Sequence, residues 1–126
     1  MMKIAVIITR VLMGGMFLFA SIVVLFNLVP HPELTGKVKV FMDGIAATGY
    51  LLTMLKIFEL ICGVAFLLGR FVPLAAVVIF PIILNILMFH IFLDHTGLPI
   101  AILLMIGDLF LAYYYRDKYK PLFVAK

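Results

Sequence analysis

Residues 71–93 read FVPLAAVVIFPIILNILMFHIFL and contain no Asp, Glu, Lys or Arg. In a helix, about 20 apolar residues at 1.5 Å rise per residue cross the roughly 30 Å hydrocarbon layer of a bilayer. This stretch is therefore long enough and apolar enough to span a membrane. Its apolar residues are continuous and do not alternate with polar ones, which excludes a strand of a membrane β-barrel.

Three further stretches are also long and mostly apolar, at Ile4–Leu28, Tyr50–Gly69 and Leu98–Tyr115. The 126 residues are 67% apolar and only 13% charged, whereas a soluble domain is about 45–50% apolar and about a quarter charged. The mean hydropathy is +1.31, and the polar residues are too few to cover a water-facing surface. The sequence predicts a single all-α domain over residues 1–126, a polytopic membrane protein built as a four-helix transmembrane bundle.

The first apolar stretch begins behind Lys3, as the h-region of a signal peptide does. It runs to about Val29, however, which is longer than an h-region, and no A-x-A cleavage pattern follows it. We therefore expect a retained first span.

The segment between the first two spans, Pro30–Gly49, has an amphipathic pattern. Its apolar residues recur at helical spacing, and its polar residues lie elsewhere on the helical wheel; they are Leu34, Val38, Phe41, Met42 and Ile45 against Lys37, Lys39, Asp43 and Thr48. Such a helix lies in the membrane interface or covers one end of a bundle. Simple packing over the helix ends is the alternative.

Four spans put both termini on one side of the membrane, and the basic residues outside the spans favour that side by six to two. They are Lys3, Arg70, Arg116, Lys118, Lys120 and Lys126 on the side of the termini, against Lys37 and Lys39 on the other. The positive-inside rule then predicts cytoplasmic termini. The net charge of +4 thus reflects membrane orientation, and nucleic-acid binding is not expected.

The spans themselves contain two basic and two acidic residues, Arg10, Lys56, Glu59 and Asp108. Because a charged side chain is costly inside a bilayer, we expect these residues to face inward and to neutralise one another. Lys56 and Glu59 are three residues apart and share a helix face, and Glu59 and Asp108 are at similar depth. Arg10 is nearer the cytoplasmic end and either joins them or extends outward.

Pro81 removes one backbone hydrogen bond from the third span and predicts a break or bend there, with Asn85 one turn further on. Together with the four charges, Asn85 makes a candidate polar site within the membrane. The site is either functional, for a substrate, a quinone or a proton, or an ion-pair cluster that only fixes the helix register. Asn85 equally serves a hydrogen bond between helices.

Other chemistry finds little support. His31, His90 and His95 are expected near the outer surface with Glu33 and Asp94, but their spacing matches no metal motif, so no metal site is predicted. Cys62 is the one cysteine of the chain, which excludes an internal disulfide or a dithiol pair.

Several short motifs together resemble the DoxX family of small bacterial four-helix membrane proteins. They are Ala46–Tyr50, Lys56–Gly63 and Gly69–Ala75, preceded by Arg10 and Gly14 in the first span. The resemblance covers nearly the whole chain. It implies a bacterial inner-membrane protein linked to redox metabolism, because relatives are associated with thiosulfate:quinone oxidoreductase and with oxidoreductase complexes of oxidative-stress defence.

Three functions follow from these observations. The first is a quinone-linked or anchoring subunit of a membrane oxidoreductase, in which the polar residues of the spans hydrogen-bond a quinone and a partner subunit carries out the electron transfer. The second is a small transporter or channel. The third is a non-catalytic scaffold or assembly protein in which the charges are structural.

Overall fold

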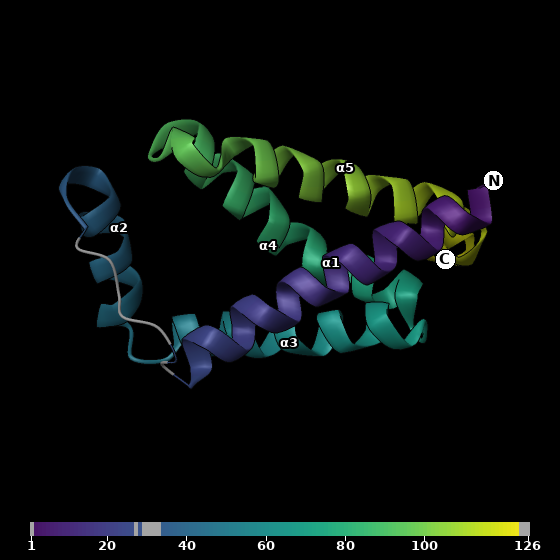
Figure 1. Cartoon of the computed structure of the whole chain (residues 1–126), viewed down its shortest axis with the longest axis horizontal. Coiled ribbons are helices and arrows are strands. Elements are labelled where there is room, and N and C mark those ends of the chain that lie inside the picture. Colours follow the sequence, from purple (N-terminus) through teal and green to yellow (C-terminus); the bar gives the residue numbers. More distant parts are fainter. Residues whose placement is uncertain (1, 27, 29–33, 124–126) are drawn as a thin grey trace.

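The computed structural model of the chain describes residues 2–26, 28 and 34–123, and these residues are almost entirely helical (Figure 1). The elements are α1 (Met2–Leu25), α2 (Gly36–Ala47), α3 (Leu51–Leu68), α4 (Val72–Phe92), the 3₁₀ turn η1 (His95–Gly97), α5 (Leu98–Tyr114), α6 (Arg116–Tyr119) and the 3₁₀ turn η2 (Lys120–Phe123). Four of these segments are long and apolar enough to cross a membrane: α1, α3, α4, and α5 together with η1. The predicted all-α architecture with four candidate spans is confirmed.

The boundaries of the spans agree with the predicted ones to within three residues. The largest difference is at the end of α1, which stops at Leu25 and not at Leu28. There the Leu28 amide donates to the Val23 carbonyl, five residues earlier, a bond typical of helix ends. At the end of α3, Gly69 has a φ of 71°, and the Arg70 amide donates to the Ala65 carbonyl in the same way.

The four spans form a ring in which α1 packs against α3, α3 against α4, α4 against α5, and α5 against α1. The pairing of α1 with α3 depends on Gly14 and Gly63, because a Cβ added to Gly14 would lie 2.8 Å from the Gly63 carbonyl oxygen. The largest side chains buried between the helices include Phe66, Ile79 and Leu111. The absence of side chains at the two glycines therefore lets the backbones of α1 and α3 touch.

Of the break or bend predicted at Pro81, the break does not occur: α4 continues through this residue without interruption. A proline inside a helix removes a single hydrogen bond, and its fixed φ is compatible with helical geometry. The strong hydropathy of this segment, in a medium that cannot hydrogen-bond an unwound backbone, favours the continuous helix.

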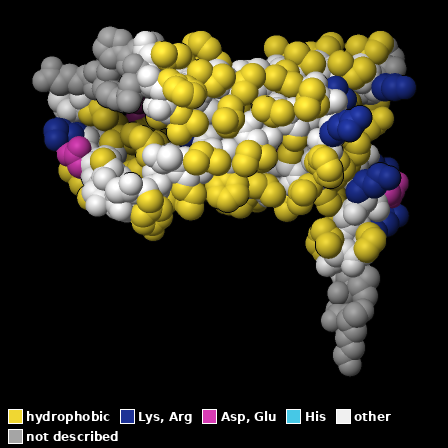
Figure 2. Space-filling view, turned by 90° about the horizontal axis from the view of Figure 1, so that it is seen from below, with side chains coloured by type: hydrophobic (Ala, Val, Ile, Leu, Met, Phe, Trp, Pro, Cys, Tyr) yellow, Lys and Arg dark blue, Asp and Glu magenta, His cyan; other side chains and the backbone are white. Residues whose placement is uncertain are grey.

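The two ends of the bundle differ in charge. We call the end where α1 begins and α5 stops the basic end. Lys and Arg side chains gather at this end, whereas the surface along the middle of the bundle is mostly apolar (Figure 2). The basic side chains that carry this end are Lys3, Arg70, Arg116, Lys118 and Lys120. The opposite end carries α2, so we call it the α2 end (Figure 1). The start of α1 and the segment that follows α5 both lie at the basic end, as an even number of spans requires (Figure 1).

A short segment at the basic end was not predicted. After α5 the chain turns through α6 and η2, and the Tyr119 hydroxyl donates a 2.6 Å hydrogen bond to the Pro73 carbonyl at the start of α4. Arg116 lies over the ring of Tyr113 at 4.4 Å. These contacts connect α6 with the start of α4 and with the end of α5.

Candidate functional site

A cavity of about 480 Å³ occupies the half of the bundle nearest the α2 end. All five long helices contribute to its wall, and most of the contributing side chains are apolar. The polar ones are Lys56 and Glu59 from α3 and Asn85 and His90 from α4. A mostly apolar cavity with a few polar groups is the usual form of a small-molecule site.

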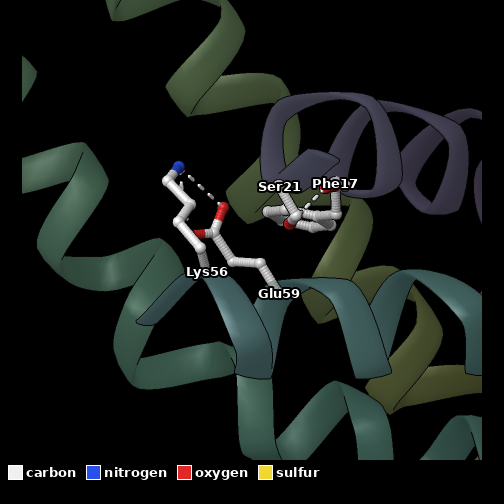
Figure 3. A network of polar contacts seen from close by, with 4 residues as sticks. All are labelled: Phe17, Ser21, Lys56 and Glu59. Carbon is white, nitrogen blue, oxygen red and sulfur yellow. Dashed lines mark hydrogen bonds and ion pairs between the residues drawn. The ribbon is translucent and has the colours of Figure 1, made fainter. Parts of the chain in front are cut away.

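Lys56 and Glu59 form an ion pair in the wall of this cavity, as their spacing predicts. The distance from Lys56 Nζ to Glu59 Oε2 is 3.3 Å, and Lys56 Nζ also donates to Oε1 at 3.5 Å (Figure 3). The Glu59 side chain is only 5% exposed and that of Lys56 is 18% exposed. The pair places two compensating charges where an unpaired one would be costly, and its ammonium group keeps donors free for a further acceptor.

The cavity adjoins the outer surface of the bundle near the middle of α1 and α4. Met16 of α1 and Pro81 and Asn85 of α4 line it and are exposed, and they lie near the middle of their helices. Figure 1 shows α1 and α5 close together at the basic end and diverging towards the α2 end. An apolar molecule dissolved in the bilayer would therefore meet the cavity from the side.

The helix α2 covers the cavity at its outer end. Phe41, Met42 and Ile45, three of the apolar residues predicted to share one face, line the cavity, and the Phe41 ring lies 5.1 Å from that of Phe89 on α4. Val40, on another face of α2, is 73% exposed. The amphipathic helix thus forms over the predicted segment and covers one end of the bundle.

Arg10 lies apart from this cavity, nearer the basic end. Its Nε donates a 2.9 Å hydrogen bond to the Phe66 carbonyl in the last turn of α3, and its guanidinium lies beside Gly69. A cation at the carboxyl end of a helix is favoured by the helix dipole. The sequence left open whether Arg10 joins the other charged residues of the spans or extends outward. In the structure Arg10 does not join the Lys56–Glu59 pair.

Asp108 also lies outside the cavity. It is 1% exposed, its Oδ1 has no hydrogen-bond partner among the described residues, and it follows the cavity residue Leu104 by one helical turn. The expected mutual neutralisation of four charges is therefore seen only for Lys56 and Glu59. The depth predicted from the sequence is similar for Glu59 and Asp108. It could not show that only Glu59 lies in the cavity, because it contains no information on which helix faces meet.

Two of the three histidines lie at the α2 end of the bundle, His90 in the last turn of α4 and His95 in η1. His90 lines the cavity, and its Nδ1 is 2.9 Å from the Asp94 carbonyl oxygen, while His95 Nε2 is 2.7 Å from the Ile91 carbonyl oxygen. The Asp94 carboxylate accepts bonds from the Thr96 hydroxyl and amide, and these bonds lower the pKa of Asp94. Within the described part of the chain, no three His, Cys, Asp or Glu side chains are grouped as metal ligands would be. His31 and Glu33 lie outside the described residues.

Comparison with known proteins identifies the family. The DoxX family model matches residues 5–93, which include the first three spans, the α2 helix and the Lys56–Glu59 pair. This match is shorter than the nearly full-length resemblance expected from the motifs, because α5 with Asp108 lies beyond it. Neither the curated proteins nor the solved structures contain a significant match. The chain is a member of the DoxX family of membrane proteins.

Proposed function

We propose that this DoxX protein is a quinone-linked or anchoring subunit of a membrane oxidoreductase system and that its cavity receives the ring of a lipid-soluble quinone. The bacterial inner membrane is its proposed location, with the basic end in the cytoplasm. The observation that carries the proposal is the laterally open, mostly apolar cavity with the Lys56–Glu59 pair in its wall.

The side chains of the cavity suit the chemistry of a quinone. A quinone offers two carbonyl oxygens as acceptors on an apolar ring, and Lys56 and Asn85 are donors within the cavity wall. The aromatic rings of Phe41 and Phe89 supply flat apolar surface beside them. The volume of about 480 Å³ is within the range of small-molecule sites, which is about 300–1,000 Å³.

The residues of the chain also favour a subunit over a self-sufficient enzyme. Cys62 is the one cysteine in the sequence, so the chain has no dithiol pair with which to accept two electrons. A bound quinone would carry the electrons, and a partner subunit would deliver or remove them. The chain's own residues would bind and orient the ring.

Binding of a short-chain quinone to the purified protein in lipid nanodiscs tests the proposal. Ala20 lines the cavity, so Ala20→Phe fills part of it and should weaken binding by about tenfold or more, or 1.4 kcal/mol. Val11→Phe is the matched control, because Val11 lies on the same helix with 46% of its surface exposed. This control should bind as the wild type does.

Two results would contradict the proposal. One is wild-type protein that neither retains a quinone through purification, as judged by mass spectrometry of the extract, nor binds the added one. The other is equal binding by the wild type and by a folded Ala20→Phe variant, which would put the quinone elsewhere on the protein.

A further inference from the structure

Asp108 is a buried carboxyl group for which the bundle provides no counter-charge. Its exposed fraction is 1%, and Oδ1 lacks any hydrogen-bond partner among the described residues. The ion pairs found in the described part of the chain involve Asp43, Glu59 and Asp117, but not Asp108. Arg10, the cation of the neighbouring helix α1, is bound to the Phe66 carbonyl. The residue therefore does not serve as half of an ion pair that fixes helix register.

A carboxylate without a partner in an apolar interior carries a large desolvation cost, whereas a protonated carboxyl carries a far smaller one. The surroundings of Asp108 therefore favour the form that holds a proton. A residue needed only for packing would be better served by an apolar side chain of similar volume, such as leucine. The presence of a carboxyl group at this position therefore indicates that Asp108 binds a proton as part of its role.

The location of Asp108 connects it with both the basic end and the cavity. Towards the basic end lies Tyr119, a half-buried residue outside the spans, and its burial raises the pKa of Tyr119. Cys62 of α3 is a buried residue one helical turn from Glu59 on the same helix. Leu104, one turn before Asp108 on the same buried face of α5, is part of the cavity wall.

Other titratable groups lie on the elements around Asp108. They include Lys56, Glu59 and Cys62 on α3, Tyr114 on α5, Tyr115 and Tyr119 beyond its end, Arg10 on α1 and His90 at the far end of α4. Of these, Glu59 is the carboxylate inside the cavity, and its charge is balanced by Lys56.

We propose that Asp108 is an intramembrane proton-binding site that exchanges its proton with the basic end. The exchange is a simple proton transfer, in which an O–H bond of Asp108 breaks or forms and a water molecule at the basic end gains or loses the proton. Its use in binding a quinone rests on the proposed function, but the proton site itself does not.

Chemical modification tests the proton site directly. A membrane-permeant carbodiimide adds to a protonated carboxyl: the acid proton moves to nitrogen, a carbon–oxygen bond forms, and migration of the acyl group leaves a stable N-acylurea. Protein in liposomes is treated with this reagent over a range of pH, and the modified carboxyls are identified by peptide mass spectrometry. We expect modification at Asp108 that decreases as the pH rises, because the carboxylate form does not react.

Matched variants make the result specific. Asp108→Asn should remove the modification, whereas Asp117→Asn, at an exposed residue paired with Lys120, should leave it unchanged.

Different results overturn different parts of the proposal. Modification confined to exposed carboxyls, or modification of Asp108 that does not change between mildly acidic and mildly basic pH, would overturn the exchangeable proton site. Protein that shows the pH-dependent modification but binds no quinone would keep the proton site and reject the proposed function.

Discussion

The Lys56 ammonium and the Glu59 carboxylate are 3.3 Å apart, so each compensates a charge that would otherwise be stranded within the membrane. Removing one partner of a buried pair costs about 3–5 kcal/mol in soluble proteins, and less in a membrane, where the stranded group finds other partners. We therefore expect Glu59→Ala to lower the thermal stability of the purified protein. The double variant Lys56→Ala/Glu59→Ala should recover much of the loss.

Glu59→Gln is the control for shape, because it keeps the side chain and removes only its charge. If the pair is structural, this variant should fold and complement a deletion strain, and if the pair handles protons, it should fold and fail to complement. A double variant no more stable than the worse single one would show that Lys56 and Glu59 do not stabilise one another.

The spacing of Lys56 and Glu59 was sufficient to predict their pairing, because residues three apart on a helix always share a face. No such rule relates residues on different helices. The positions of Arg10 at the end of α3 and of Asp108 outside the cavity depend on how the helices are rotated, so the sequence left them open. The sequence placed His90 near the end of its span, but its position in the cavity wall depends on how α4 is arranged against α2.

The contact between α1 and α3 gives a sharp comparison of two adjacent glycines. A Cβ at Gly14 would lie 2.8 Å from the Gly63 carbonyl oxygen, whereas a Cβ at Gly15 would meet nothing within 4 Å. Gly14→Ala should therefore separate the two helices and lower the thermal stability. Gly15→Ala should be neutral or stabilising by about 0.5–1 kcal/mol, because alanine is the better helix former. Equal effects of the two substitutions would contradict the close approach.

The helices themselves could be predicted to within three residues because hydropathy and length determine a span almost alone. The amphipathic α2 was predictable from its periodicity. The α6 segment was not, since Arg116–Tyr119 is short and polar and depends on the bond from Tyr119 to Pro73. Pro81 was misleading, because its effect on a helix depends on surroundings that the sequence does not specify.

The distribution of charge over the bundle predicts its orientation in the membrane. Basic side chains gather at the end that carries both termini, and the positive-inside rule assigns that end to the cytoplasm (Figure 2). A reporter that is active only in the periplasm should be inactive when fused after Lys126. The same reporter fused to a chain truncated after Gly49 should be active. Activity of the first fusion would reverse the proposed orientation.

The exposed cavity residues Met16, Pro81 and Asn85 lie in mid-span, so the entrance of the proposed quinone site is expected to adjoin hydrocarbon and not water. A guest molecule then arrives by two-dimensional diffusion within the leaflet, and its mole fraction in the lipid sets how often the cavity is filled. Adding empty vesicles at a constant total amount of guest should therefore deplete the cavity, although the volume of the aqueous phase is unchanged. Affinities for this protein are comparable between laboratories only when the lipid-to-protein ratio is stated.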